Sequence, residues 1–389
     1  MAETPNSGSS ERRGMNSPDK ATTRAVESCR NALPPTVDGG RVVFGFDGYI
    51  DRVREFVSER QSAESYDRVP TLDAFADRVN ASVEANSSLT FEWIQAGVRT
   101  GGHVSHLARA FGTMGFDPAL IGCFGDPPED PFIEEFGDFT LETLGAPGYT
   151  DAVEFDDGKL MLTEVGALTA LDWVDIESRV GLDRLSELVD GTELFGMGYW
   201  SEMPALPDVT RGVREDLWPT LSNPPETLLL DPGDLRKREP DVVAKGVEQV
   251  SKLDDSVDVV VSANRYETRY LAQLAGVEAD DFERETRAAF DYLGVTRFVG
   301  HGIEAAHLVD DDGAAHVRVP RIDDPELTTS SGDHFNAGLA LAHVLGLGRA
   351  ESLVVGNAVA GHFVRNGTPP TYDEIKTFVT SYIDYFNET

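Results

Sequence analysis

An aspartate at the start of a predicted helix is the residue with the clearest chemical potential in this chain. Residues 327–338 read Leu-Thr-Thr-Ser-Ser-Gly-Asp-His-Phe-Asn-Ala-Gly, and Leu339 and Ala342 continue one apolar helical face. The unpaired backbone N–H groups at such a helix start favour an anion. Asp333 could accept a hydroxyl proton there while these N–H groups hold a transferring phosphoryl group. Alternatively, Asp333 or Ser331 simply caps the helix.

The composition limits the partners that such a site could serve. The 389 residues carry 68 Asp and Glu against 33 Lys and Arg, a formal net charge of -35. This charge repels phosphate backbones, so nucleic acid and anionic membrane surfaces are not expected partners. Because the acidic residues are spread along the whole chain, they indicate a surface adapted to high cytoplasmic salt, as in halophiles.

Other classes of protein are also disfavoured by the sequence. Cys29 and Cys123 are the two cysteines, which are too few for a disulfide framework, and no Cys or His spacing indicates zinc. The N-terminus is polar, and no apolar run approaches the roughly 18 residues that span a bilayer. We therefore expect a cytoplasmic globular protein.

Strand-like and helix-like segments alternate along most of the chain. Short apolar runs that end in Gly, Asp or Asn predict buried strands at residues 41–48, 118–126, 227–232, 257–264 and 295–300. Amphipathic stretches predict helices between them, at residues 104–114, 240–252 and 280–293. This alternation predicts an α/β fold whose mostly parallel central sheet is covered by helices on both faces.

Two parts of the chain depart from the alternation. Residues 149–168 contain two strand-like runs around the turn Asp156-Asp157-Gly158, which predicts a hairpin. With residues 88–94 this hairpin could form a small β lid, from segments at about 50–100 and 147–170. Residues 1–39 are polar and are expected to form a disordered or loosely ordered tail before a domain at 40–389, although a short helix at residues 20–33 remains open.

The Asp333 segment resembles the C-terminal signature of the PfkB, or ribokinase-like, family of carbohydrate kinases. That signature reads Gly-Ala-Gly-Asp, with Phe two residues and Gly five residues further on. Gly332, Asp333, Phe335 and Gly338 match it, whereas Ser330 and Ser331 stand at the first glycine and the alanine. The resemblance implies that Ser331, Gly332 and Asp333 form an anion hole and that Asp333 is the catalytic base. Serine at position 330 tolerates a positive φ less well than glycine does.

The segment that begins at Gly101 and Gly102 resembles the substrate-binding segment of the family, in which two glycines open a helix that carries asparagines toward the sugar. His103 and Ser105 stand at the polar positions here. The first strand is followed by Asp47 and Asp51, and the resemblance places a substrate-binding aspartate there. We expect Asp51 to fill this role, with Asp47 as the alternative.

The nucleotide and its metal ion are implied by three further segments. Asn264 and Glu267 match the family motif Asn-x-x-Glu, in which the glutamate orders water around Mg²⁺; the alternative is a helix cap with its capping-box partner. Gly302 and Asn357 fall where the family binds the nucleotide. Residues 231–236, Asp-Pro-Gly-Asp-Leu-Arg, resemble a mid-chain family turn.

The resemblance covers roughly residues 41–385 and implies a ribokinase-like three-layer fold. It also implies ATP- and Mg²⁺-dependent phosphorylation of a hydroxyl on a sugar-like molecule, and a homodimer paired through the lid. Two alternatives remain open: an ADP-dependent sugar kinase, and an inactive protein that only binds a sugar or nucleotide. No P-loop and no Gly-x-Gly-x-x-Gly motif competes with this interpretation.

Overall fold

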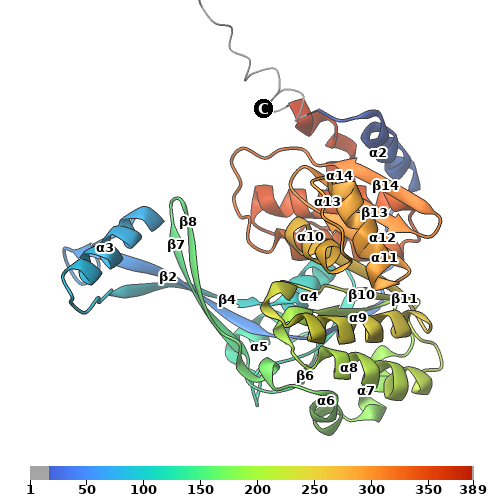
Figure 1. The fold of residues 1–389 in the computed structure, drawn as a ribbon, viewed down its shortest axis with the longest axis horizontal. Coiled ribbons are helices and arrows are strands. Elements are labelled where there is room, and N and C mark those ends of the chain that lie inside the picture. Colours follow the sequence, from blue (N-terminus) through green and yellow to red (C-terminus); the bar gives the residue numbers. More distant parts are fainter. Residues whose placement is uncertain (1–16, 388–389) are drawn as a thin grey trace, which may run out of the picture.

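The protein is built around a nine-stranded sheet (Figure 1). The computed structural model describes residues 17–387. The order of the strands is β14-β13-β12-β11-β10-β9-β1-β5-β6. Their bounds are β1 Arg41–Phe46, β5 Asp117–Gly122, β6 Thr140–Thr143, β9 Leu194–Gly198, β10 Thr227–Leu230, β11 Asp258–Asn264, β12 Arg297–His301, β13 Ala305–Asp310 and β14 Gly313–Arg318.

The pairing of these strands confirms the predicted mostly parallel sheet. The run from β12 to β6 is parallel throughout, and β13 and β14 add an antiparallel edge. All seven parallel strands therefore point their carboxyl ends toward one edge of the sheet, which is where ligands bind in open α/β folds.

Helices cover both faces of this sheet. In β1, Val42 and Phe44 belong to one hydrophobic cluster, and Val43 between them belongs to the other, because successive strand residues point to opposite faces. The first cluster includes residues of α2, α4 and α12–α14, and the second includes residues of α6–α9 and α11. The bounds are α2 Lys20–Ala32, α4 His103–Thr113, α5 Asp130–Phe136, α6 Trp173–Val180, α7 Leu182–Val189, α8 Leu206–Gly212, α9 Pro240–Asp254, α10 Arg265–Leu274, α11 Phe282–Leu293, α12 Ser331–Val344, α13 Arg349–Asn366 and α14 Tyr372–Ser381. The three-layer α/β/α fold is thereby confirmed.

A second, five-stranded sheet projects from the main body (Figure 1). It comprises β2 Tyr49–Arg60, β3 Tyr66–Arg68, β4 Trp93–Gly101, β7 Gly148–Phe155 and β8 Gly158–Glu164, with α3 Leu72–Glu84 beside it. The predicted β7–β8 hairpin is present. We call this sheet with α3 the lid sheet. Phe56, Val69, Val153 and Phe155 give it a small core of its own.

The N-terminal segment corrects the expectation of a tail over residues 1–39. Residues 1–16 lie outside the described part of the chain, but residues 20–32 form α2, as the alternative allowed. Val26 and Cys29 are fully buried within the cluster that includes α13 and α14. The Asp19 side chain accepts a hydrogen bond from Thr22 N and caps the helix. Residues 17–39 therefore belong to the folded body.

Between residues 17 and 387, no helix combines the length and the apolar character that crossing a lipid bilayer requires.

Candidate active site

Asp333 lies at the carboxyl edge of the sheet, one turn into α12. Its side chain is 3% exposed, and its Oδ1 accepts hydrogen bonds from His103 Nδ1 at 3.0 Å and from the Tyr199 hydroxyl at 2.6 Å. The N-cap residue of α12 is Ser330, and no side chain caps this helix. The alternative in which Asp333 or Ser331 is only a cap is therefore not observed. Neither of the two bonds uses Oδ2, which leaves that oxygen for another partner.

The start of α12 has the backbone needed to hold an anion. Ser330 adopts the left-handed conformation with φ 66° and ψ 12°, and Ser331 begins the helix. His334 N donates the first helical bond, to Ser330 O at 3.2 Å. The N–H groups of Gly332 and Asp333 precede it and so belong to the unpaired first turn. A left-handed residue followed by helical residues forms a concave backbone nest of the kind that binds anions.

The two aspartates that follow β1 have different roles. Asp47 is fully buried and accepts hydrogen bonds from His103 N at 2.7 Å and Val104 N at 2.9 Å, so it caps α4. Burial raises the pKa of Asp47 to about 7 despite these two donors. Gly102 has φ 90°, and a Cβ there would lie 2.8 Å from Asp47 Oδ2, so only glycine fits.

Asp51 lies on β2, at the junction of the lid sheet and the main body. It pairs with Arg99 across the lid sheet, and the two side-chain atoms are 3.9 Å apart. A Cβ at Gly101 would lie 2.7 Å from Asp51 Oδ2, so the carboxylate packs directly on this glycine. Asp51, Gly101 and Gly102 are therefore close to one another, as predicted. Ser105 is on α4, and its buried hydroxyl has no hydrogen-bond partner among the described residues.

His103 connects three buried carboxylates. Besides its bond to Asp333, its Nδ1 lies 3.7 Å from Asp231 Oδ2, and its backbone binds Asp47. Burial lowers the pKa of His103, but its hydrogen bond to Asp333 and the charges of Asp231, Asp333 and Asp47 outweigh burial and raise it. Burial likewise opposes the ionisation of Asp333, yet His103, the nearby His106 and Tyr199 together hold its pKa well below the usual range. The favoured state is an imidazolium beside an ionised Asp333.

Tyr199 and Asn336 were missed by the sequence analysis, and Asp231 appeared there only as part of a turn. Tyr199 follows β9, and Asp231 follows β10, so the parallel topology brings both to Asp333. Asn336 Nδ2 donates to Asp231 Oδ2 at 2.7 Å, and Gly233 N donates to Asp231 Oδ1 at 2.8 Å. For Tyr199 and Asp231, the position at a strand end was the available signal, but many residues share it.

Asn264 and Glu267 form the capping box that was considered as the alternative. Asn264 Oδ1 accepts from the N–H groups of Tyr266 and Glu267, and Glu267 accepts from Asn264 N at 2.8 Å. Burial and the negative charges of Asp231 and Asp234 raise the pKa of Glu267 to about 8. Glu267 is partly buried near other carboxylates, and such oxygen-rich, negative surroundings fit a hydrated Mg²⁺ ion.

The two predicted nucleotide residues lie in different surroundings. Gly302 follows β12, where His301 stacks on Phe335 with ring centroids 4.6 Å apart, beside the start of α12. Asn357 is buried in α13, and its amide donates to the Tyr382 hydroxyl at 3.0 Å. The Asn357 amide thus has a hydrogen-bond partner within the protein, and a contact between Asn357 and a nucleotide stays a prediction.

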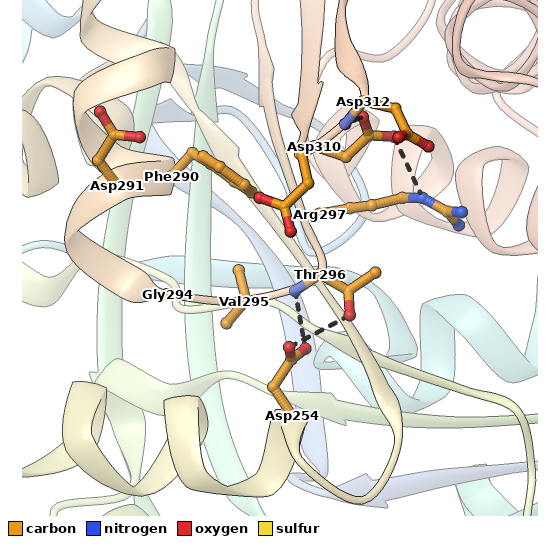
Figure 2. Close-up of a pocket in the computed structure, with 10 residues that line it drawn as sticks. Asp254, Phe290, Asp291, Gly294, Val295, Thr296, Arg297, Asp310 and Asp312 are labelled. Carbon is orange, nitrogen blue, oxygen red and sulfur yellow. Dashed lines mark hydrogen bonds and ion pairs between the residues drawn. The ribbon is translucent and has the colours of Figure 1, made fainter.

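A separate pocket lies at the opposite edge of the sheet (Figure 2). Its volume is about 440 Å³, and its lining includes Asp254, Asp291, Asp310 and Asp312. Asp254 accepts from Thr296 N at 2.8 Å, just before β12 begins. Because acidic side chains dominate this lining, the pocket is unsuited to the phosphates of a nucleotide.

Comparisons with known proteins agree with this geometry. The chain is similar in structure to a ribokinase from Thermotoga maritima, with a TM-score of 0.59 and 17% identity over 88% of this chain and 99% of the other. It is similarly close to phosphofructokinase-2 from Escherichia coli in complex with fructose-6-phosphate, with a TM-score of 0.60 and 14% identity over 88% and 99% of the two chains. At these identities the likeness establishes the fold alone, which is ribokinase-like.

Another known protein is far more similar to this chain in sequence than these two structures are. A ketohexokinase from the halophile Haloferax volcanii is 79% identical over 373 residues, which cover 96% of this chain and 100% of that protein. Fold and sequence together therefore define a carbohydrate kinase. More particularly, the model of the prokaryotic ketohexokinase family matches residues 18–382, and the chain belongs to that family.

Proposed function

We propose that this chain transfers the γ-phosphoryl group of ATP to a hydroxyl of a ketohexose, with Asp333 as the catalytic base. The observation that supports this most is the position of Asp333. Its Oδ1 is held by His103 and Tyr199, Oδ2 accepts neither of these bonds, and Asp333 itself lies in the first turn of α12. The sugar class follows from the name of the Haloferax volcanii relative.

In this mechanism Asp333 Oδ2 accepts the proton of the attacking hydroxyl, and the backbone N–H groups of Gly332 and Asp333 hold the phosphoryl oxygens. The N–H of Ser331, which the resemblance also placed in the anion hole, instead donates to Thr328 O at 3.3 Å. The low pKa of Asp333 keeps it ionised at neutral pH. A weak base is sufficient, because a loose phosphoryl-transfer transition state depends more on positioning and on electrostatic stabilisation than on proton abstraction.

The sugar is placed under the lid sheet, against the start of α4. Asp51 supplies carboxylate acceptors there, and the absence of a side chain at Gly101 lets this carboxylate pack directly beside the start of α4. Two buried polar atoms without partners among the described residues, His103 Nε2 and Ser105 Oγ, are available for sugar hydroxyls. Closure of the lid sheet would exclude water and so protect the nucleotide from hydrolysis.

Mg²⁺ fits near Glu267 and Asn264, where Glu267 would hold it through water. When bound, the ion neutralises negative charge on the nucleotide phosphates. The contribution of the chain is the carboxylate of Glu267, which the capping box fixes in place near the negative charges of Asp231 and Asp234.

The function is tested by measuring sugar phosphate and nucleotide products in molar KCl, with Mg²⁺ and fructose, and with ATP and ADP as alternative donors. A panel of aldohexoses, pentoses and nucleosides provides the comparison. We expect ADP to accumulate from ATP with fructose at the highest kcat/KM. Faster transfer from ADP, or binding of fructose without any product, would replace the proposal with one of the two alternatives.

Glu267→Gln should separate the capping role from the metal role. Glutamine keeps the capping-box acceptor, so the unfolding midpoint should change little. Because glutamine cannot ionise when Mg²⁺ binds, the Mg²⁺ concentration for half-maximal activity should rise on the order of tenfold, equivalent to about 1.4 kcal/mol of binding free energy. Titration of activity with Mg²⁺ measures this, and an unchanged requirement would leave Glu267 a cap only.

The lid sheet also offers a surface for a second copy of the chain. β8 is an edge strand of this sheet, and Met161 and Leu162 on it are 45% and 48% exposed. An open edge strand with apolar side chains favours pairing with another strand. We expect a dimer in light scattering, and Leu162→Lys should shift it toward the monomer, whereas a monomeric wild-type protein would contradict the pairing.

A further inference from the structure

Ser330 occupies a backbone conformation that disfavours serine. It is one of two non-glycine residues with positive φ among the described residues, and it stands where the family signature has glycine. Side chains other than glycine are strained in the left-handed region. Its hydroxyl does not cap the helix that it precedes. The side chain therefore contributes neither a favoured conformation nor a helix cap.

The hydroxyl of Ser330 is instead held by His106 of α4, which is itself held by Arg109 of the same helix. Ser330 Oγ lies 2.8 Å from His106 Nε2, and His106 Nδ1 lies 2.9 Å from Arg109 Nη1. Arg109 is itself fixed by bonds to Thr100 O and Thr100 Oγ1, at 3.1 and 2.7 Å, and by an ion pair with Glu135. These contacts join the anion-binding turn to the helix that carries the sugar-binding segment.

The direction of each hydrogen bond follows from the chemistry of the groups. A guanidinium only donates, so His106 Nδ1 must accept. Burial lowers the pKa of His106 to about 3, so its ring is neutral and carries its one proton on Nε2. Nε2 therefore donates to Ser330 Oγ, which leaves the hydroxyl proton of Ser330 for a different acceptor.

The surroundings of that proton favour an anion. Ser330 is partly exposed, unlike the buried His106, so a ligand can reach it. It lies two residues before Gly332, where the unpaired N–H groups of the first turn of α12 begin, and these groups already favour negative charge. A hydroxyl that accepts from a polarised imidazole is a better donor, because hydrogen bonds in series strengthen one another.

We propose that Ser330 donates a hydrogen bond from its hydroxyl to the transferring phosphoryl group, and that Arg109 and His106 position it. Ser330 thus adds to the anion hole a side-chain donor that glycine cannot supply. No proton leaves Ser330, since Asp333 takes the proton of the sugar hydroxyl. This inference rests on the proposed kinase function, and it makes Ser330 a catalytic residue, with His106 and Arg109 as positioning residues.

Two substitutions at position 330 separate the hydroxyl from the backbone strain. Ser330→Ala removes the hydroxyl and keeps the strain, whereas Ser330→Gly removes both. We expect kcat to fall roughly 10- to 100-fold in both variants, with the KM of fructose and of ATP changed less than about threefold, because the donor acts mainly in the transition state. The unfolding midpoint should rise only for Ser330→Gly.

The outcomes of this comparison are distinct. Wild-type kcat in Ser330→Gly would overturn the inference, and so would a loss confined to Ser330→Ala, because strain would then explain it. A change in KM with unchanged kcat would also overturn it. Failure of the wild-type protein to phosphorylate any sugar would instead reject the proposed function, so the wild-type rate is measured first.

A double-mutant cycle tests the positioning role of His106. His106→Gln should lower kcat less than Ser330→Ala does, and in the Ser330→Ala background it should have almost no further effect. Additive losses would show that His106 does not act through Ser330 and would overturn that part of the inference.

Discussion

Asp333→Asn is expected to fold like the wild-type protein and to lose on the order of 10²- to 10⁴-fold in kcat, the span usual for general acid–base catalysis. Asparagine retains an oxygen that can accept the bonds from His103 and Tyr199, so the local geometry should survive. Its amide nitrogen would replace the oxygen that takes the proton. The loss should therefore appear in kcat, with the KM of the sugar little changed.

The control for this variant is an equal change of charge elsewhere. The Asp312 side chain is 93% exposed and lies in the pocket at the opposite edge of the sheet, so Asp312→Asn should retain wild-type kcat. Steady-state kinetics with fructose and ATP, together with the unfolding midpoint of each variant, make the comparison. Turnover near the wild-type value in Asp333→Asn would mean that another group takes the proton.

Much of the body of the fold could be predicted because its signals are local. Buried strands such as β1 and β11 are short apolar runs, and α9 and α11 have a regular apolar face. α2 was harder to predict because its buried residues are small or polar. Thr22, Ala25, Val26 and Cys29 follow helical spacing, but they are too weakly apolar to distinguish a packed helix from a tail.

The lid sheet was predicted only in part for a related reason. β2 is long, but its burial is intermittent because one face of the lid sheet is open to solvent. α3 buries no residue fully, so the apolar periodicity that marks a core helix is weak there. In both elements, packing within a small separate core decides the structure, and that core comes from distant segments of the chain.

Within the site, the residues that belong to a sequence motif could be predicted. The residues that only the order of the strands brings to the site could not. Asp333, Gly102 and His103 lie in segments whose spacing marks a helix start. Tyr199 reaches Asp333 only because β9 lies between β1 and β10 in the sheet. The choice between Asp47 and Asp51 likewise depended on three-dimensional structure, since only the structure shows Asp47 bound to the first N–H groups of α4.

The sequence alone also identified Ser330 as the unusual residue of the predicted anion hole. It did not show which residues contact the Ser330 hydroxyl. Serine in place of glycine at position 330 indicated a strained turn, and the structure keeps the positive φ of that turn. The partners of its hydroxyl, His106 and Arg109, come from α4, more than 200 residues earlier in the chain. The same helix carries His103, so α4 contacts both the base and the turn beside it.

His103→Asn has the second-largest expected effect. Asparagine can still donate to Asp333 Oδ1, but three buried carboxylates, Asp333, Asp231 and Asp47, lose the cation that they share. Removing one partner of a buried ion pair costs about 3 to 5 kcal/mol of unfolding free energy. We also expect kcat to fall on the order of 10²-fold, because Asp333 is less firmly placed.

The pH dependence of stability distinguishes this charge effect from a loss of packing. The pKa of His103 is raised in the folded protein, so its stabilisation is complete below the unfolded pKa of histidine, near 6.5, and is lost as pH rises through the higher folded value. The difference in unfolding free energy between wild type and His103→Asn should therefore shrink with rising pH. His316→Asn is the matched control, since His316 makes a 2.8 Å bond to Asp19 with both side chains 39% exposed, and an exposed pair contributes less than about 1 kcal/mol. A difference that stays constant with pH would mean that His103 stabilises the site by packing and not by its charge.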